Sequence, residues 1–202
     1  MKYFLLVPIL AVFILAGCAK ENSIMGPQSQ TQSKSQWIKI NHTPSLSVEN
    51  TYSVSKSIDG SKGGDLSIAQ IFKNDGNWAL VTAKVTIPKG AFSGTQVISY
   101  TVNTETAGID FSPSGMTFNK PLNLDMVFTG INISGYKGTT LTFSYLDGST
   151  IVPARFTYVN ASIAQGLLAV FGAQINHFSR YAWSTLDGTP ILDGGSLGVV
   201  VE

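Results

Sequence analysis

The segment "ALVTAKVTI", residues 79–87, sets the pattern for most of this 202-residue chain. Apolar side chains occupy every second position from Ala79 to Ile87, and the positions between them are mostly polar. Successive side chains of a β-strand point to opposite faces of a sheet, so this alternation predicts a strand with one buried face. Residues 122–128 and 141–145 repeat the alternation. These segments predict half-buried strands.

The composition agrees with a chain built from strands and turns. Hydrophobic residues make up 44% and charged residues 12% of the chain, which contains 20 glycines. Further strands are predicted near residues 51–58, 66–72, 96–102, 155–164 and 167–178, separated by turn phrases such as "DGSKGGD", "KNDGN", "SPSG" and "LDGS". Many short strands without long helical segments favour an all-β fold, an antiparallel β-sandwich.

One segment is also compatible with a helix. "ASIAQGLLAVFGAQI", residues 161–175, contains Gly166 and Gly172, which would each cost a helix about 1 kcal/mol relative to alanine. A turn at Gln165-Gly166 would instead make a β-hairpin. We therefore predict a hairpin here.

The N-terminus has the layout of a secretory signal. Lys2 precedes an apolar run and small residues, and the phrase "LAGC" ends at Cys18, the single cysteine. This phrase resembles the lipobox of bacterial lipoproteins, which implies cleavage after residues 1–17 and lipidation of Cys18, with palmitate among the acyl chains. The alternative is an uncleaved membrane anchor over residues 3–19, at the short limit for a spanning helix. We favour lipidation because the cysteine stands where the motif requires it.

Residues 18–36 would then form the lipidated cysteine and a polar, low-complexity tether. The folded domain is expected to span residues 37–202. The resemblance implies a cell-envelope protein that faces outside the cytoplasm, held in the outer membrane if the cell has one, because Ala19 rather than aspartate follows the cysteine. With 13 basic and 12 acidic residues, the chain offers no charge excess for nucleic acid, which we do not expect as a partner.

The middle of the chain resembles the ZU5 domain, a β-sandwich known from ankyrins, netrin receptors and death-domain adaptors. The resemblance is strongest over residues 58–184. The matching phrases are "VTIPKGAFSGTQVISYTV" (85–102), "IDFSPSGMTFNKPLNLDMVF" (109–128) and "HFSRYAW" (177–183). Relatives of this family serve as interaction and scaffold modules, so the resemblance implies a fold and no particular chemistry.

Each phrase also has a structural explanation. Pro88 is expected to end a strand, and Gly90 to allow a turn with positive φ. Pro121 is expected to stiffen the entry into the strand that follows it.

The tripeptide His177-Phe178-Ser179 is the strongest candidate for chemistry. It resembles the self-cleavage site of some ZU5-containing adaptors and of a nucleoporin domain. That resemblance implies Ser179 as nucleophile, His177 as general base and the Phe178-Ser179 bond as the one broken. In a regular strand His177 and Ser179 would share a face, but attack on the preceding carbonyl would need local strain. The alternative, which we favour, is that Phe178 packs in the core, with Tyr181 or Trp183, and that its neighbours are ordinary polar groups.

Other catalytic sites have less support. His42 and His177 lie far apart, so no residues have zinc-ligand spacing, and we expect no metal and no cofactor. "DGSKGGD", residues 59–65, lacks the ligand pattern of a calcium loop and is expected to be a turn. Asp110, Asp125 and Asp147 fall on different elements, Asp125 on an outer face, which disfavours a glycan-active hydrolase.

Exposed aromatic side chains would support a binding face for a protein or a carbohydrate. The candidates are Trp78, Tyr100, Tyr136, Tyr145 and Tyr158. The sequence therefore predicts a lipid-anchored, non-catalytic binding or structural module, with self-cleavage at Phe178-Ser179 as the alternative and a glycan-active hydrolase as a weaker one.

Overall fold

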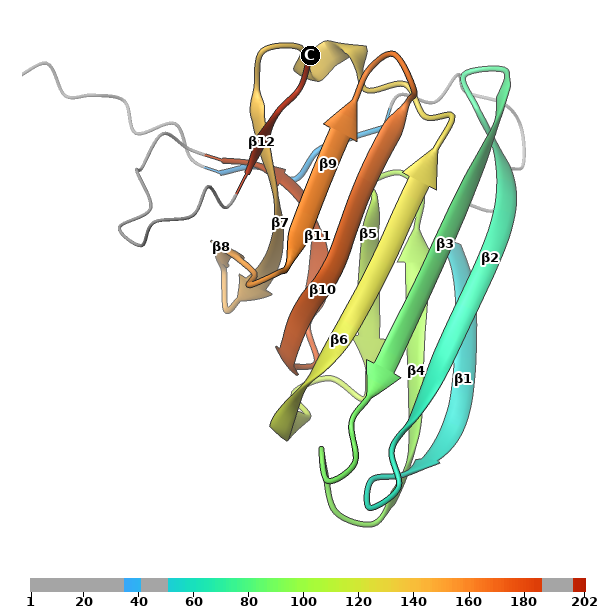
Figure 1. Cartoon of the computed structure of the whole chain (residues 1–202), viewed down its shortest axis with the longest axis vertical. Helices are drawn as coiled ribbons and strands as arrows, with labels where there is room; N and C mark the ends of the chain where they lie inside the picture. Colours follow the sequence, from blue (N-terminus) through green and yellow to red (C-terminus); the bar gives the residue numbers. More distant parts are fainter. Residues whose placement is uncertain (1–34, 41–50, 187–197) are drawn as a thin grey trace, which may run out of the picture. The chain divides into compact units, whose positions relative to one another are not determined.

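The computed structural model describes residues 35–40, 51–186 and 198–202, and these form two antiparallel sheets packed face to face. The prediction of an all-β sandwich is confirmed. Figure 1 shows the second sheet in front of the first. The strands are β1 (Thr51–Asp59), β2 (Gly64–Asn74), β3 (Asn77–Ile87), β4 (Thr95–Asn103), β5 (Gly108–Ser112), β6 (Thr117–Thr129), β7 (Thr140–Asp147), β8 (Thr150–Pro153), β9 (Tyr158–Ser162), β10 (Leu167–His177), β11 (Arg180–Thr185) and β12 (Val199–Val200). A 3-10 turn, η1 (Ser134–Tyr136), precedes β7.

The chain passes repeatedly between the two sheets. The first sheet has the order β1-β4-β5-β11-β7-β12, with β8 paired to β7, and the second has the order β2-β3-β6-β10-β9. Along the chain, one strand or a pair of consecutive strands in one sheet is followed by one strand or a pair in the other. Each sheet is therefore assembled from segments that are distant in the sequence.

The core lies between the two sheets and is filled by the alternating side chains. In β3, Val81 and Val85 are fully buried, and in β6 so are Leu124 and Phe128. The hydroxyl of Tyr100, on β4 of the first sheet, donates a hydrogen bond of 2.9 Å to the carbonyl oxygen of Ala83, on β3 of the second sheet. Because burial raises the pKa of Tyr100, this hydroxyl keeps its proton and remains a donor.

The N-terminal described segment joins the sandwich along β11. Trp37 forms a bridge with Ser184, and Ile38 is fully buried and donates its backbone N–H to the carbonyl of Trp183. Gln36 is held there as well, since its backbone N–H donates to Thr185 Oγ1 at 3.1 Å and its carbonyl accepts from the N–H of Thr185 at 2.8 Å. Residues 1–34, which include the predicted signal and most of the tether, lie outside the described residues.

The predicted hairpin is present, with β9 and β10 joined by a turn at residues 163–166. β10 contains a bulge between Val170 and Ala173, where Gly172 has a φ of 65° and donates its backbone N–H to Asp125. The helical alternative is thus replaced by a bulged strand.

Some predicted boundaries were wrong. The strand expected at 155–164 begins only at Tyr158, and the prediction omitted three short strands, β5, β8 and β12. These strands are too short to show a clear alternation, and β11 shows none because its residues Tyr181 to Ser184 are all buried.

The three structural residues of the family-like phrases are partly as expected. β3 ends immediately before Pro88, and Gly90 has a φ of 84°. Pro121, however, lies inside β6 rather than before it. The ladder to β10 is interrupted there, between the pairs Leu122–Ile175 and Thr117–His177, so the missing N–H of proline breaks no ladder bond.

The geometry of the β2–β3 and β9–β10 turns can be tested at one glycine in each turn. Gly166 and Gly76 both have positive φ, but an added Cβ would lie 2.5 Å from the carbonyl oxygen of Ile131 at Gly166 and would meet nothing within 4 Å at Gly76. We expect Gly76→Ala to lower the free energy of unfolding by about 1 kcal/mol because of backbone strain alone. Gly166→Ala should lower it by about 2–3 kcal/mol because it adds a close contact. Urea unfolding followed by near-ultraviolet circular dichroism measures both, and equal losses would contradict this turn geometry.

Candidate functional site

The Phe178-Ser179 bond lies where the chain crosses from one sheet to the other. β10 of the second sheet ends at His177, and β11 of the first sheet begins at Arg180. Phe178 and Ser179 form a bend between them. The chain therefore does not form the regular strand in which His177 and Ser179 would share a face, because it changes sheets between these residues and Arg180.

Phe178 is buried, as we favoured from the sequence. Its ring is stacked on Phe111, with centroids 5.1 Å apart, and meets the ring of Phe118 edge-on at 4.8 Å. Its backbone N–H donates to the carbonyl of Met116 at 2.7 Å, and its carbonyl accepts a hydrogen bond of 3.3 Å from the N–H of Gly115. Tyr181 and Trp183 are buried as well. The aromatic ring and both backbone groups hold the crossover in place.

The hydroxyl of Ser179 makes a structural contact. It donates a hydrogen bond of 2.6 Å to the carbonyl oxygen of Leu146, near the end of β7. The carbonyl of Ser179 accepts from the N–H of Phe111. The side chain thus ties the crossover to β7.

The imidazole of His177 packs against aromatic rings. Its centroid lies 5.2 Å from that of Tyr145 and 6.3 Å from that of Tyr181. The Tyr181 hydroxyl donates to the carbonyl of His177 at 3.0 Å, and burial raises the pKa of Tyr181, so this donor stays protonated. Within the part of the chain that the structure describes, no hydrogen bond joins His177 to Ser179. The two are neighbours in sequence without the contact that a base and a nucleophile make.

Positive φ at a non-glycine residue is one form of backbone strain, and in the described residues it occurs away from the Phe178-Ser179 bond. Asp75 and Ala107 are the non-glycine residues with positive φ there, at 51° and 45°. The geometry at Phe178 and Ser179 is not of this kind.

Asp110 and Asp125, which were weighed for hydrolysis, and Asp59, which was weighed for calcium binding, make separate structural contacts. Asp110 forms an ion pair with Arg180, its Oδ1 lying 2.8 Å from Nε, and Asp125 is exposed and accepts from Gly172. Asp59 accepts from the backbone and side chain of Ser61 in the predicted turn, and these bonds lower the pKa of its carboxyl group. Among the described residues no group of three or more His, Cys, Asp or Glu could hold a metal ion.

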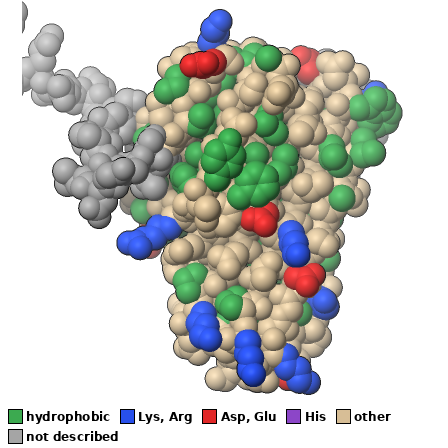
Figure 2. All heavy atoms as spheres, viewed as in Figure 1, with side chains coloured by type: hydrophobic (Ala, Val, Ile, Leu, Met, Phe, Trp, Pro, Cys, Tyr) green, Lys and Arg blue, Asp and Glu red, His purple; other side chains and the backbone are tan. Residues whose placement is uncertain are grey.

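Three aromatic side chains are exposed on the outer face of the second sheet. They are Trp78 (68% exposed), Tyr158 (54%) and Phe171 (40%), and the last two are stacked with centroids 6.2 Å apart. Figure 2 shows hydrophobic side chains gathered over the middle and upper part of this face. Tyr100 was wrongly predicted to be exposed, since its strand turns it into the core, while Tyr136 and Tyr145 are half-buried.

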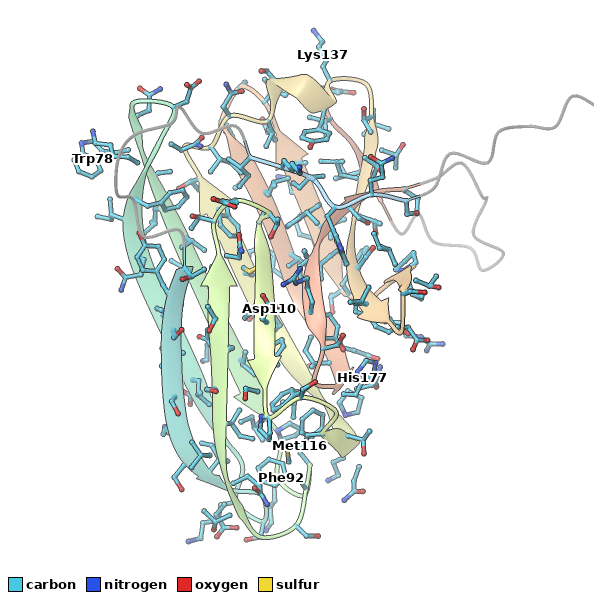
Figure 3. All side chains as sticks on the ribbon, turned by 180° about the vertical axis from the view of Figure 1, so that it is seen from behind. Trp78, Phe92, Asp110, Met116, Lys137 and His177 are labelled. Carbon is cyan, nitrogen blue, oxygen red and sulfur yellow. The ribbon has the colours of Figure 1, made fainter. Side chains whose placement is uncertain are left out.

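A polar pocket that we did not predict opens beside Trp78. It has a volume of about 360 Å³ and lies between the β2–β3 turn, residues 130–132 and the β9–β10 turn. The phrase "KNDGN" predicted the first turn, but only the fold brings the other two beside it. Figure 3 shows Trp78 near the upper end of the sandwich and His177 in its lower half, on the other side.

Comparison with known proteins gives no relative. No protein-family model matches the sequence, and neither curated proteins nor solved structures return a match. Cys18 and His42 lie outside the described residues. Among the residues that the structure describes, no helix is long and apolar enough to span a bilayer. The resemblance to ZU5 domains stays a prediction.

The crossover can be tested with two phenylalanines from the same part of the chain. Phe178→Ala should lower the free energy of unfolding by about 3–5 kcal/mol because it leaves a cavity in the aromatic cluster. Phe171→Ala, at a partly exposed position, should lower it by about 1 kcal/mol or less. Chemical denaturation of both variants measures the difference. A loss at Phe178 no larger than that at Phe171 would refute the structural role of Phe178.

Proposed function

We propose that this protein is a lipid-anchored, ZU5-like β-sandwich of the cell envelope that acts as a non-catalytic binding or structural module. The observation that carries the proposal is the outer face of the second sheet, where Trp78, Tyr158 and Phe171 are exposed. Large aromatic side chains in water are costly unless a partner covers them, and aromatic residues are enriched in binding surfaces.

The contacts of the one reactive-looking tripeptide also support a role without turnover. The Ser179 hydroxyl donates to a backbone carbonyl, which is not a base, and Phe178 fills the core. These contacts give Ser179 and Phe178 a role in the stability of the fold.

The anchor is proposed from the sequence, on "LAGC" and the single cysteine. Lipid on Cys18 would hold the protein at the membrane, residues 19–36 would space the domain from it, and the sandwich would present its outer face to a protein or carbohydrate partner. A flexible tether of this length has a root-mean-square reach of roughly 20–25 Å.

Lipidation predicts the behaviour of two variants of the full-length protein. Wild type and Ala19→Ser, which keeps the cysteine, should incorporate radiolabelled palmitate and sediment with membranes. Cys18→Ser should lose the label and accumulate as the unprocessed precursor. Labelling that survives in Cys18→Ser would reject lipidation at this position. If wild type sediments with membranes unlabelled and uncut, the uncleaved anchor over residues 3–19 is the better explanation.

Self-cleavage at Phe178-Ser179 is retained as the second candidate because of one contact. The N–H of Gly115 lies 3.3 Å from the carbonyl oxygen of Phe178, the atom on which negative charge would develop during attack by Ser179. A backbone donor aimed at this atom is a part that such a reaction needs.

The mass of the intact chain distinguishes the two candidates. Under the binding proposal, purified wild-type protein gives one polypeptide that extends beyond Ser179, and Ser179→Ala has the same processing. A fragment that begins at Ser179 in wild type and is abolished in Ser179→Ala would establish self-cleavage instead. His177→Ala serves as the test of the base, since it should slow any such cleavage.

A further inference from the structure

The pocket beside Trp78 is built by three chain segments that meet at one end of the sandwich. Its polar lining side chains are Asn74, Asp75, Asn77, Asn132 and Gln165, with Trp78 at its side. The pocket's volume of about 360 Å³ falls within the range of about 300–1,000 Å³ that small-ligand sites occupy.

The floor of the pocket is closely packed. An added Cβ at Gly130 would lie 2.5 Å from the carbonyl oxygen of Trp78, and one at Gly166 would lie 2.5 Å from that of Ile131. The N–H of Ile131 donates to the carbonyl of Gly166 at 3.1 Å. The three segments therefore touch through their backbones, which fixes the positions of the side chains around them.

The polar side chains are held by one another. The backbone N–H of Asn132 donates to Asn74 Oδ1 at 2.7 Å, and Asn132 Nδ2 donates to Asp75 Oδ2 at 3.0 Å. Asp75 and Gly76 have φ values of 51° and 79°, as a two-residue hairpin turn between Asn74 and Asn77 requires. A ligand would meet amide and carboxylate groups that are already oriented.

Trp78 offers a flat apolar surface beside these groups. Its side chain is 68% exposed, and the ammonium of Lys73 lies 3.7 Å from the centroid of its ring. This cation–π contact restrains the indole, which lowers the entropy lost when a ligand stacks on it. Figure 3 shows Trp78 projecting outward near the end of the β2–β3 hairpin.

The charges around the pocket select the class of ligand. The lining carries one carboxylate, on Asp75, and three asparagines and a glutamine, but no cationic side chain. The Asp75 carboxylate is offset by the Lys73 ammonium over the Trp78 ring, so the surroundings favour a ligand without net charge. An apolar ligand would leave the amides without partners. A neutral polyhydroxylated ring fits both parts of the surface, since its hydroxyls match amides and a carboxylate and its C–H face matches an indole.

We propose that this pocket binds a neutral saccharide, with Trp78 as the stacking platform and Asp75, Asn132 and Gln165 as hydrogen-bonding partners. This inference rests on the proposed binding function and specifies its ligand class and its site.

The test is calorimetric titration of the full-length protein in a detergent without a sugar headgroup, such as lauryldimethylamine oxide. The probes are chitotetraose and cellotetraose, which differ in their acetamido groups. Saturable binding of at least one in the micromolar to millimolar range is expected. Trp78→Ala should weaken this binding about tenfold or more, as truncation does for an aromatic side chain that the ligand covers on binding. Gln165→Ala, at an exposed position in the β9–β10 turn, should weaken it several-fold.

Val97→Ala is the matched control, because Val97 is an exposed hydrophobic residue on β4 of the first sheet, outside both the pocket and the aromatic face. It should leave the affinity unchanged, and thermal unfolding of every variant confirms that it folds. The proposal is overturned if neither tetrasaccharide binds, or if Trp78→Ala weakens binding no more than Val97→Ala does. Palmitate labelling is measured separately from sugar binding. If the protein is labelled but binds neither sugar, the lipid anchor is supported and this site is rejected. If the protein is unlabelled but binds a sugar, the site is supported and the lipid anchor is rejected.

Discussion

Burial of one apolar face from each sheet holds this structure together, and every other feature depends on it. Neither sheet is stable alone, since each would expose a row of aliphatic and aromatic side chains to water. The Tyr100 hydroxyl, which donates to the carbonyl of Ala83, makes a polar contact between the sheets. It adds specificity to an interface whose stability comes from apolar area, because a single neutral hydrogen bond contributes about 1 kcal/mol.

Where the chain crosses from one sheet to the other, its backbone polar groups must also be paired. At the β10–β11 crossover the backbone leaves one ladder before it enters the next, so its polar groups need other partners. The carbonyl of Met116 and the N–H groups of Gly115 and Phe111 supply them. The Ser179 hydroxyl adds a bond to the carbonyl of Leu146, and the ring of Phe178 packs in the core beside them. These contacts give the tripeptide His177-Phe178-Ser179 a structural role. The same contacts place a backbone donor at the Phe178 carbonyl, which is why cleavage remains the competing proposal.

The saccharide proposal comes from a different part of the molecule. There the β2–β3 and β9–β10 turns converge with residues 130–132, and polar side chains gather beside an exposed indole. Loops at the ends of a rigid sandwich vary without disturbing the core, so they are common positions for binding sites. The aromatic pair Tyr158 and Phe171 lies apart from this pocket on the face of the sheet, and it would serve a flatter partner.

The sequence by itself determined the fold class, most strands, the β9–β10 hairpin and the burial of Phe178, because alternation and turn residues act over neighbouring positions. It could not give the short strands β5, β8 and β12, the change of sheet after His177, or the burial of Tyr100, because these depend on pairing with distant segments. The pocket is the clearest case: "KNDGN" indicates a turn, but only tertiary structure brings Asn132 and Gln165 beside Trp78. Contacts between residues far apart in the chain leave no local pattern, and a binding site made from three loops consists of such contacts.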